Sequence, residues 1–190
     1  MTPAELNALI RKRRSVFPRQ YVDKPIPKEI IEQILENANW APTHKLTQPW
    51  RFKVLRGEAL KKLSTFLGEH YQANTPAEDF SEIKLKKMTS NPLKSNVAIA
   101  ICMQRDPKQS LPEWEELAAV ACAVQNMYLT CTAYDVGCYW ATPAAALAAD
   151  DFLNLNEGER CLGLLYMGYH DGAVEDSKRN PIEEKTVWME

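Results

Sequence analysis

The feature that most constrains the fold is a nearly unbroken apolar run from Asn96 to Met103 (NVAIAICM). A run of this length and composition is typical of a β-strand that is covered on both faces of its sheet. A second run, Arg160 to Gly168 (RCLGLLYMG), has the same character. The rest of the chain must therefore supply helices for both faces of one sheet.

Helix and strand patterns fill the segments around these two runs. Thr2 and Glu5 form a capping box around Pro3, so a helix is expected to start there and to stop before Pro18. Apolar spacing predicts further helices at Pro27–Pro42, Gly57–Glu69, Glu78–Thr89, Glu113–Tyr134 and Ala144–Asn154. Strands are expected at Trp50–Leu55 and Gly137–Thr142. Gly137 is also expected to form the C-cap of the long helix before it.

This order of elements predicts an α+β or α/β fold with helices on both faces of one sheet. The chain shows no internal repeat, low-complexity segment or linker. Its 190 residues match about one domain, so residues 1–190 are expected to form a single domain.

Charge and composition limit the partners of the chain. The net charge of −2 argues against nucleic acid as the main partner. No secretory signal is visible, and the most apolar stretch, Leu117 to Ala133, is too short to span a membrane. The five cysteines form no Cys-x-x-Cys pair, so we expect reduced buried thiols, a cytoplasmic protein and no zinc site.

Two basic clusters are candidates for a phosphate site. Arg13-Arg14-Ser15 stands where the first helix gives way to extended chain, and forked guanidinium donors with a hydroxyl suit phosphate oxygens. The alternative is that these cations only favour the helix C-terminus and stay solvated. Lys178-Arg179-Asn180-Pro181 near the other end of the chain either completes the phosphate site or forms a surface turn.

Two further segments suit a planar ligand. The loop between Pro42 and Pro49 presents His44, where a histidine donor either rims a planar ring or is simply structural. In Gly137 to Pro143, small residues beside aromatics let a flat ring come close, and the alternative is a plain core strand. There is no Gly-x-Ser-x-Gly, Walker or Gly-x-Gly-x-x-Gly motif. Arginine, serine and aromatic residues together therefore favour flavin mononucleotide (FMN) over a dinucleotide.

In this order, the four segments resemble the flavin-dependent nitroreductase family, in particular its short NAD(P)H nitroreductase branch. The resemblance rests on Arg13-Arg14-Ser15, the loop from Ala41-Pro42 to Gln48-Pro49-Trp50, Gly137 to Pro143, and Arg179 to Glu184. It implies an α+β fold with a central, mostly antiparallel sheet flanked by helices. It also implies a homodimer that exchanges C-terminal tails, buries Trp188 and holds FMN in its interface.

The resemblance also implies a set of cofactor-binding residues. Those near the phosphate and ribityl chain would be Arg13, Arg14, Ser15 and Arg179. Those that reach across from the other subunit would be Trp40, Thr43 and His44. Those that line the isoalloxazine, by side chain or backbone, would be Trp140, Ala141 and Thr142. Three positions depart from larger relatives: Phe17 replaces a lysine, Leu46 replaces an asparagine, and Ala144-Ala145-Ala146 replaces a Glu-Gly pair.

The activity that the resemblance implies is that of an oxidoreductase. NADH or NADPH would reduce FMN, and the flavin would then reduce a nitroaromatic, quinone or similar electron-poor small molecule, with ping-pong kinetics. No catalytic side chain is assigned, because the cofactor carries the chemistry. Two other hypotheses stay open: a non-catalytic FMN carrier or sensor, and a structural dimer with an empty site.

Overall fold

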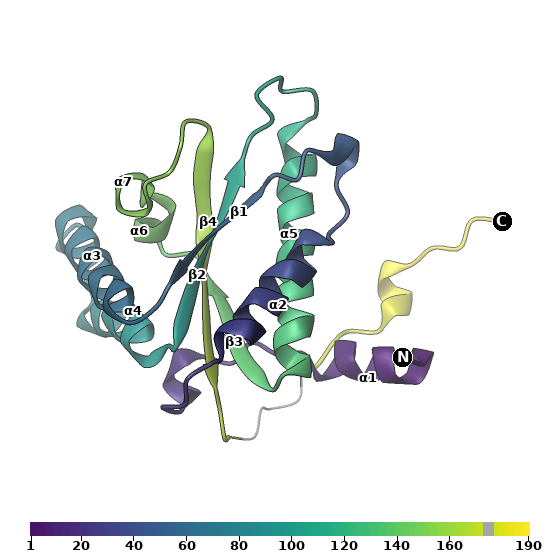
Figure 1. Ribbon diagram of the computed structural model, residues 1–190, viewed down its shortest axis with the longest axis horizontal. Coiled ribbons are helices and arrows are strands. Elements are labelled where there is room, and N and C mark those ends of the chain that lie inside the picture. Colours follow the sequence, from purple (N-terminus) through teal and green to yellow (C-terminus); the bar gives the residue numbers. More distant parts are fainter. Residues whose placement is uncertain (173–176) are drawn as a thin grey trace.

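The computed structural model describes residues 1–172 and 177–190 of the chain. At its centre lies a four-stranded sheet in the order β1-β2-β4-β3, and every neighbouring pair is antiparallel (Figure 1). The strands are β1 (Trp50–Leu55), β2 (Val97–Gln104), β3 (Val136–Ala141) and β4 (Glu159–Tyr169). All four strands agree with the expected segments to within a residue or two.

The helices cover both faces of this sheet, as the apolar strands require. One face carries α2 (Lys28–Asn39) and α5 (Glu113–Ala133), and the other carries α3 (Glu58–Asn74), α6 (Ala144–Leu147) and α7 (Asp150–Leu153). The helix α4 (Glu82–Lys94) packs against α3 (Figure 1). Short 3-10 turns stand at η1 (Pro18–Gln20), η2 (His44–Leu46) and η3 (Ile182–Lys185).

The central strand β2 explains why two layers of helices can pack here. Its larger side chains, from Val97 to Met103 at every second position, belong to the core under α2 and α5. The residues between them, Ala98, Ala100 and Cys102, belong to the core on the α3 side. Successive side chains of a strand point to opposite faces, so this single run supplies both cores.

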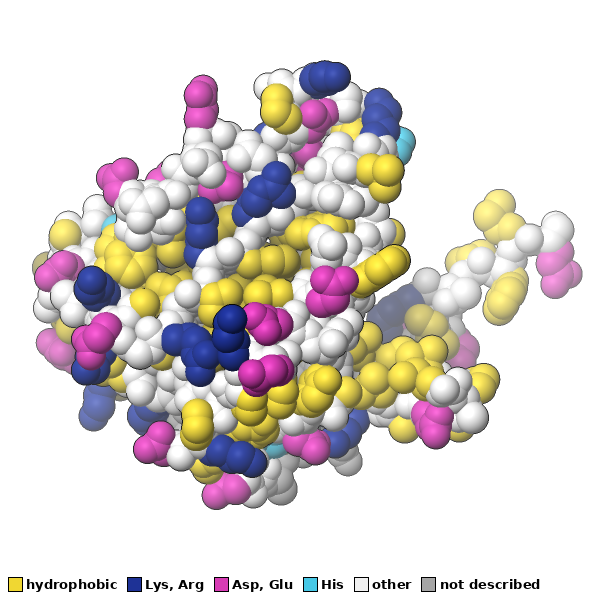
Figure 2. Space-filling view, viewed as in Figure 1, with side chains coloured by type: hydrophobic (Ala, Val, Ile, Leu, Met, Phe, Trp, Pro, Cys, Tyr) yellow, Lys and Arg dark blue, Asp and Glu magenta, His cyan; other side chains and the backbone are white. Residues whose placement is uncertain are grey.

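The first helix, α1 (Pro3–Lys12), begins as expected. The Thr2 hydroxyl accepts a hydrogen bond from the Glu5 amide, and the Glu5 carboxylate accepts one from the Thr2 amide at 2.7 Å. The helix nevertheless has no buried residue, and Leu6 and Ile10 are 43% and 47% exposed. Figure 2 shows apolar side chains along α1 and along the C-terminal tail, both of which project from the body. Trp188 is 87% exposed within this one chain.

Several boundaries differ from the sequence expectations. The expected C-cap at Gly137 is wrong: Tyr134 is the C-cap of α5, Asp135 takes the left-handed conformation (φ 52°), and Gly137 lies inside β3. The segment Ala144–Asn154 is not one helix but α6 and α7, which are separated at Ala148 and Ala149. Proline 92 does not end its helix, and α4 therefore extends five residues beyond the expected end at Thr89, to Lys94.

The cysteines are all free thiols, as expected, and four of the five are buried. Cys122 is exposed on α5, so the expectation of buried thiols fails at that position. Cys122 is exposed because α5, although apolar on nearly every side, still has one side on the surface of the chain.

Candidate functional site

The two basic clusters of the sequence meet in one hollow of about 530 Å³. We call this cavity the arginine hollow. The residues that line it are Ile10, Arg11, Arg13, Arg14, Gln125, Ser177 and Arg179. Four of these side chains are cationic, and none of the described lining residues is acidic. Converging guanidinium groups suit an anion such as phosphate, because they offer forked hydrogen-bond donors with positive charge. The arginine side chains of this hollow therefore fit a phosphate group, such as that of FMN.

Backbone direction places Arg13 and Arg14 at this hollow. Helix α1 ends at Lys12, and Arg13 turns to an extended conformation while its amide still donates to the Leu9 carbonyl oxygen. The Arg14 guanidinium donates to the carbonyl oxygens of Arg11 and Arg13, at 2.9 Å for the second. The Arg179 guanidinium donates to the Ser177 hydroxyl and, at 2.8 Å, to the Lys178 carbonyl oxygen. Main-chain acceptors thus orient both guanidinium groups.

Tyr128 on α5 anchors this part of the site. The Arg13 guanidinium lies over its ring, 5.3 Å from the centroid. Its hydroxyl lies within hydrogen-bonding reach of the Ser15 side chain and accepts a hydrogen bond from the Trp140 amide at 2.8 Å. One phenol therefore joins the Arg13–Ser15 segment to β3.

The pKa of Tyr128 reflects this mixed setting. Burial raises it above the ordinary tyrosine value, and the neighbouring Cys138 thiol adds to the rise. The contacts with Ser15, the Trp140 amide and Arg13 oppose the rise but do not cancel it. The hydroxyl is thus a neutral group that accepts from Trp140 and shares a hydrogen bond with Ser15. Sequence reasoning missed Tyr128, although a tyrosine inside an otherwise apolar helix signals a hydroxyl in need of a partner.

The chain after Ser15 runs directly along the edge of β3. The Val16 amide donates to the Cys138 carbonyl oxygen at 2.9 Å. A Cβ on Gly137 would lie 2.9 Å from the Val16 Cβ, so the missing side chain permits this approach. Gly137 thus makes room for the protein's own chain. One residue further, the ring of Phe17 packs against that of Tyr139 with 4.5 Å between centroids.

The three residues expected at the flavin ring, Trp140 and Ala141 at the end of β3 and Thr142 just after it, do not all line the same hollow. The Trp140 indole folds back onto β4 and donates to the Leu162 carbonyl oxygen at 3.2 Å, where Gly163 leaves space for it. Trp140 therefore offers backbone rather than ring to this region. Ala141 faces the opposite side of the sheet, and Ala141 and Thr142 both line a second hollow.

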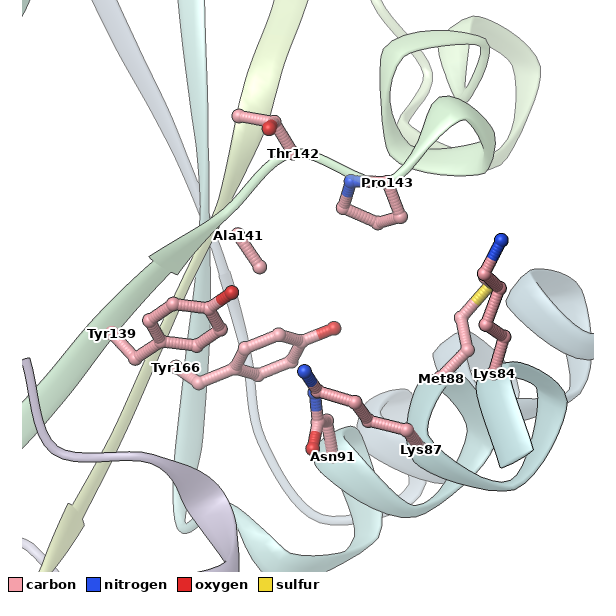
Figure 3. A pocket seen from close by; sticks show the side chains of 9 residues that line it. All are labelled: Lys84, Lys87, Met88, Asn91, Tyr139, Ala141, Thr142, Pro143 and Tyr166. Carbon is pink, nitrogen blue, oxygen red and sulfur yellow. The ribbon is translucent and has the colours of Figure 1, made fainter.

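This second hollow, of about 290 Å³, is shown in Figure 3, and we call it the tyrosine hollow. Its lining residues are Lys84, Lys87, Met88, Asn91, Tyr139, Ala141, Thr142, Pro143 and Tyr166. The hydroxyls of Tyr139 and Tyr166 point into it from the sheet, opposite the side chains of α4 (Figure 3). Burial raises the pKa of Tyr166 far above the ordinary value, so its hydroxyl stays protonated and can donate.

The loop between α2 and β1 is fixed by contacts with the start of α5. The His44 ring and the Glu115 carboxylate are 2.6 Å apart, and the Lys45 ammonium donates to the Ser110 carbonyl oxygen at 3.0 Å. The Thr43 hydroxyl accepts a hydrogen bond from the Gln48 amide at 3.1 Å. Lys45, Leu46 and Gln48 adopt positive φ, a conformation that is strained for residues with a side chain.

The structure does not bring this loop to either hollow within one chain. His44 contacts Glu115, which lies about 20 Å along α5 from Tyr128 at about 1.5 Å per residue. Trp40 is 78% exposed, donates to the Glu36 carboxylate at 3.0 Å, and lies beside Asn126 and Leu129 on another side of α5. Trp40, Thr43 and His44 are therefore apart from Arg13, Ser15 and Arg179 in the single chain.

Within residues 1–172 and 177–190, no group of three or more histidine, cysteine or acidic side chains is placed to hold a metal ion. No helix in the same part of the chain has the length and apolar character needed to cross a membrane.

The fold and sequence are similar to those of known proteins. A solved structure, the nitroreductase-like family protein from Bacillus cereus, shares 30% identity and a TM-score of 0.81, covering 100% of this chain and 98% of that chain. The FMN-dependent nitroreductase NfnB from Mycobacterium smegmatis, solved with NADPH, has a TM-score of 0.78 at 18% identity and covers 98% and 99% of the two chains. At that identity, the likeness to NfnB shows the fold alone.

Together the antiparallel sheet, its two helical layers and these neighbours define the nitroreductase-like fold. A curated relative from Bacillus subtilis (strain 168), named "Putative NAD(P)H nitroreductase YfhC", is 27% identical over 188 residues, which are 97% of this chain and 94% of that protein. The model of the Nitroreductase family matches residues 10–169. The chain therefore belongs to the Nitroreductase family, and the resemblance and α+β fold predicted from the sequence are confirmed.

Proposed function

We propose that this protein is an FMN-dependent NAD(P)H oxidoreductase that reduces nitroaromatic, quinone or similar electron-poor small molecules. The observation that carries the proposal is the arginine hollow, in which Arg13, Arg14 and Arg179 converge from opposite ends of the chain. A hollow with this donor set suits the terminal phosphate of a mononucleotide. The family and the names of its relatives supply the redox chemistry.

The binding roles follow the geometry of the two hollows. Arg13, Arg14 and Arg179 would hold the phosphate, and Ser15 would meet the ribityl chain because it stands between the arginine hollow and β3. Ala141 and Thr142 would line the isoalloxazine through the tyrosine hollow, and Trp140 would contribute its backbone. FMN, when bound there, would supply the hydride chemistry, and these residues would hold it so that NADH or NADPH and then the acceptor use it in turn.

The protein's own groups bind and orient in this scheme. Tyr128 holds Ser15 and β3 in one geometry, and the apolar strand residues around them keep water from the site. The Tyr139 and Tyr166 hydroxyls supply donors in the tyrosine hollow, and that of Tyr166 stays protonated because burial raises its pKa. We therefore assign no catalytic residue.

We further propose a homodimer in which the C-terminal tail packs on the partner. The support is the uncovered apolar surface: α1 has no buried residue, and Trp188 is 87% exposed although a tryptophan is costly to leave in water. Trp40, Thr43 and His44 would approach the flavin of the partner subunit, because none of the three lines either hollow of its own chain. The strained loop that carries Thr43 and His44 would keep them in place.

The experiment that tests the proposal is a visible absorption spectrum of the purified protein before and after anaerobic addition of NADH or NADPH. We expect flavin bands that bleach with at least one of the two nucleotides. Bands that persist with both would overturn the reductase and favour an FMN carrier or sensor. A protein without bands, even after FMN is added, would overturn both and leave a structural dimer.

A further inference from the structure

The tyrosine hollow does not end at the tyrosines. A neighbouring hollow of about 360 Å³ follows the same helix, and the two share Lys87 and Asn91. Phe17 lines the second hollow, and its ring packs against Tyr139 of the first. The two hollows therefore form one groove that runs along α4, with β3 and β4 opposite the helix at one end and Phe17 and Arg19 opposite it at the other, and we call it the α4 groove.

The α4 groove is strongly cationic. The basic residues along it are Lys84, Lys86, Lys87 and Lys94 on α4 and Arg19 on η1. None of the five forms a salt bridge with another described residue. No acidic side chain stands among the described residues that line the two hollows. A groove with one sign of charge raises the local concentration of ligands of the opposite sign.

The inner end of the groove offers hydrogen-bond donors over an apolar floor. Tyr166 is 1% exposed as a whole residue, and its hydroxyl, which makes no hydrogen bond to the described residues, points into the hollow (Figure 3). A hydroxyl that faces the hollow can donate a hydrogen bond to a ligand atom or accept one from it. The rings of Tyr139 and Phe17 and the side chain of Met88 supply flat apolar surface beside it.

We propose that the α4 groove selects acceptors that are both aromatic and anionic, such as nitro- or quinoid rings that carry a carboxylate, sulfonate or phosphate group. This inference rests on the proposed function. The ring would pack against the aromatic floor, and the anionic group would meet the ammonium groups of α4. The groove lies next to Ala141 and Thr142, so a ligand that approaches a flavin along that strand encounters these lysines.

One other ligand carries the same chemistry, namely the 2′-phosphate that distinguishes NADPH from NADH. We assign the groove to the acceptor because its cations stand beside an aromatic floor and two tyrosine hydroxyls that point into the hollow. The experiment has separate arms for the two sources of negative charge.

The test first measures binding to the flavin-loaded protein by isothermal titration calorimetry. The probes are benzenesulfonate and its neutral analogue benzenesulfonamide, which have nearly the same shape. We expect benzenesulfonate to bind about tenfold more tightly, and the preference to shrink as salt rises, because exposed charges are screened. In Lys87→Gln the preference should fall about three- to tenfold, and in the triple variant Lys84→Gln/Lys87→Gln/Lys94→Gln it should vanish.

The same variants are then assayed with 4-nitrobenzenesulfonate and 4-nitrobenzenesulfonamide as acceptors. The ratio of kcat/KM for the two should follow the binding ratio. Lys108→Gln, which removes an exposed lysine from the loop between β2 and α5, is the control and should leave both ratios unchanged. Comparing each ratio between variant and wild type cancels the different reactivity of the two nitro groups.

Three results would overturn the assignment. Equal affinity of the wild type for both probes would remove the groove as an anion site. An equal loss in Lys108→Gln would mean that only net charge matters. A NADPH-to-NADH ratio that collapses in Lys87→Gln while the sulfonate preference persists would give the groove to the nucleotide phosphate. By contrast, a protein that holds no flavin or oxidises neither nucleotide overturns the proposed function itself, and that outcome is visible before any probe is added.

Discussion

Removing the hydroxyl of Tyr128 tests the hydrogen bonds that connect the Arg13–Ser15 segment to β3. In Tyr128→Phe the ring keeps its shape, but the Trp140 amide loses the acceptor that it has at 2.8 Å. That amide points away from β4 at the edge of the sheet, so no strand replaces the lost partner. An unsatisfied buried donor costs about 1–3 kcal/mol.

The expected loss of stability for Tyr128→Phe is therefore about 1–3 kcal/mol. For a chain of this size each kcal/mol lowers Tm by about 2–4 °C, so Tm should fall by about 2–12 °C. Calorimetry on the flavin-free protein measures this directly. Ser15 loses its neighbour in the same variant, so we also expect the Kd for FMN to rise about threefold or more.

Tyr134→Phe provides a matched control on the same helix. Tyr134 is 42% exposed, and its hydroxyl makes no hydrogen bond to the described residues. Its loss should change stability by less than about 0.5 kcal/mol. The reasoning is refuted when both variants have the same Tm, because the Trp140 amide would then find an equal partner elsewhere. An unchanged FMN affinity with a lowered Tm would confine Tyr128 to a structural role.

Three further predictions concern single positions. Arg13→Ala should weaken FMN binding by about 1.5–3 kcal/mol, as for a lost charge-assisted hydrogen bond, whereas Lys12→Ala should change it little; unchanged affinity in a titration would remove Arg13 from the phosphate site. Gly163→Ala should cost at least about 2 kcal/mol, since φ is +125° and the new Cβ would lie 2.5 Å from a backbone oxygen of β3. Urea unfolding tests this against Gly172→Ala, which meets open space. Burial by itself raises the pKa of Glu159, but hydrogen bonds from its neighbour Asn156 and the charges of two basic side chains outweigh it and leave the pKa below normal. The ionised Glu159 side chain thus stabilises the folded state above about pH 4.3, and this stabilisation is lost as the pH falls through the folded-state pKa. The stability of Glu159→Gln should therefore depend less steeply on acid pH than that of the wild type. Acid titrations that run parallel for the two proteins would contradict this.

Sequence patterns predicted the fold where burial is the dominant force. The run Asn96–Met103 is apolar at nearly every position, and it became the centre of the sheet with both faces covered. The capping box at Thr2 is local chemistry, and it formed as predicted. Boundaries failed where tertiary contacts compete with local preference. Gly137 lies in a strand, where its missing side chain leaves room for the side chain of Val16, and that contact is remote in the sequence.

Some residues of the candidate site could likewise be predicted from the sequence, and others could not. Arg13, Arg14 and Arg179 could be singled out as basic residues near the two ends, and the fold brings them to one hollow. Tyr166 and Lys87 could not be found from their local patterns. The first lies in a strand that reads as plain core, and the second lies on a charged helix that reads as plain surface. Only the packing of α4 beside the sheet places the two side chains in one hollow.

The alternation of large and small side chains along β2 constrains how this sequence can change over evolution. On the α5 side the strand can tolerate shrinkage only at the cost of a cavity, because Ile99 and Ile101 fill that layer. On the α3 side the limit is reversed, since Ala98 and Ala100 leave no room for growth. Along this one strand, positions that must keep a large side chain therefore alternate with positions that must keep a small one. A duplication or slip of one residue in this segment would violate both requirements at once.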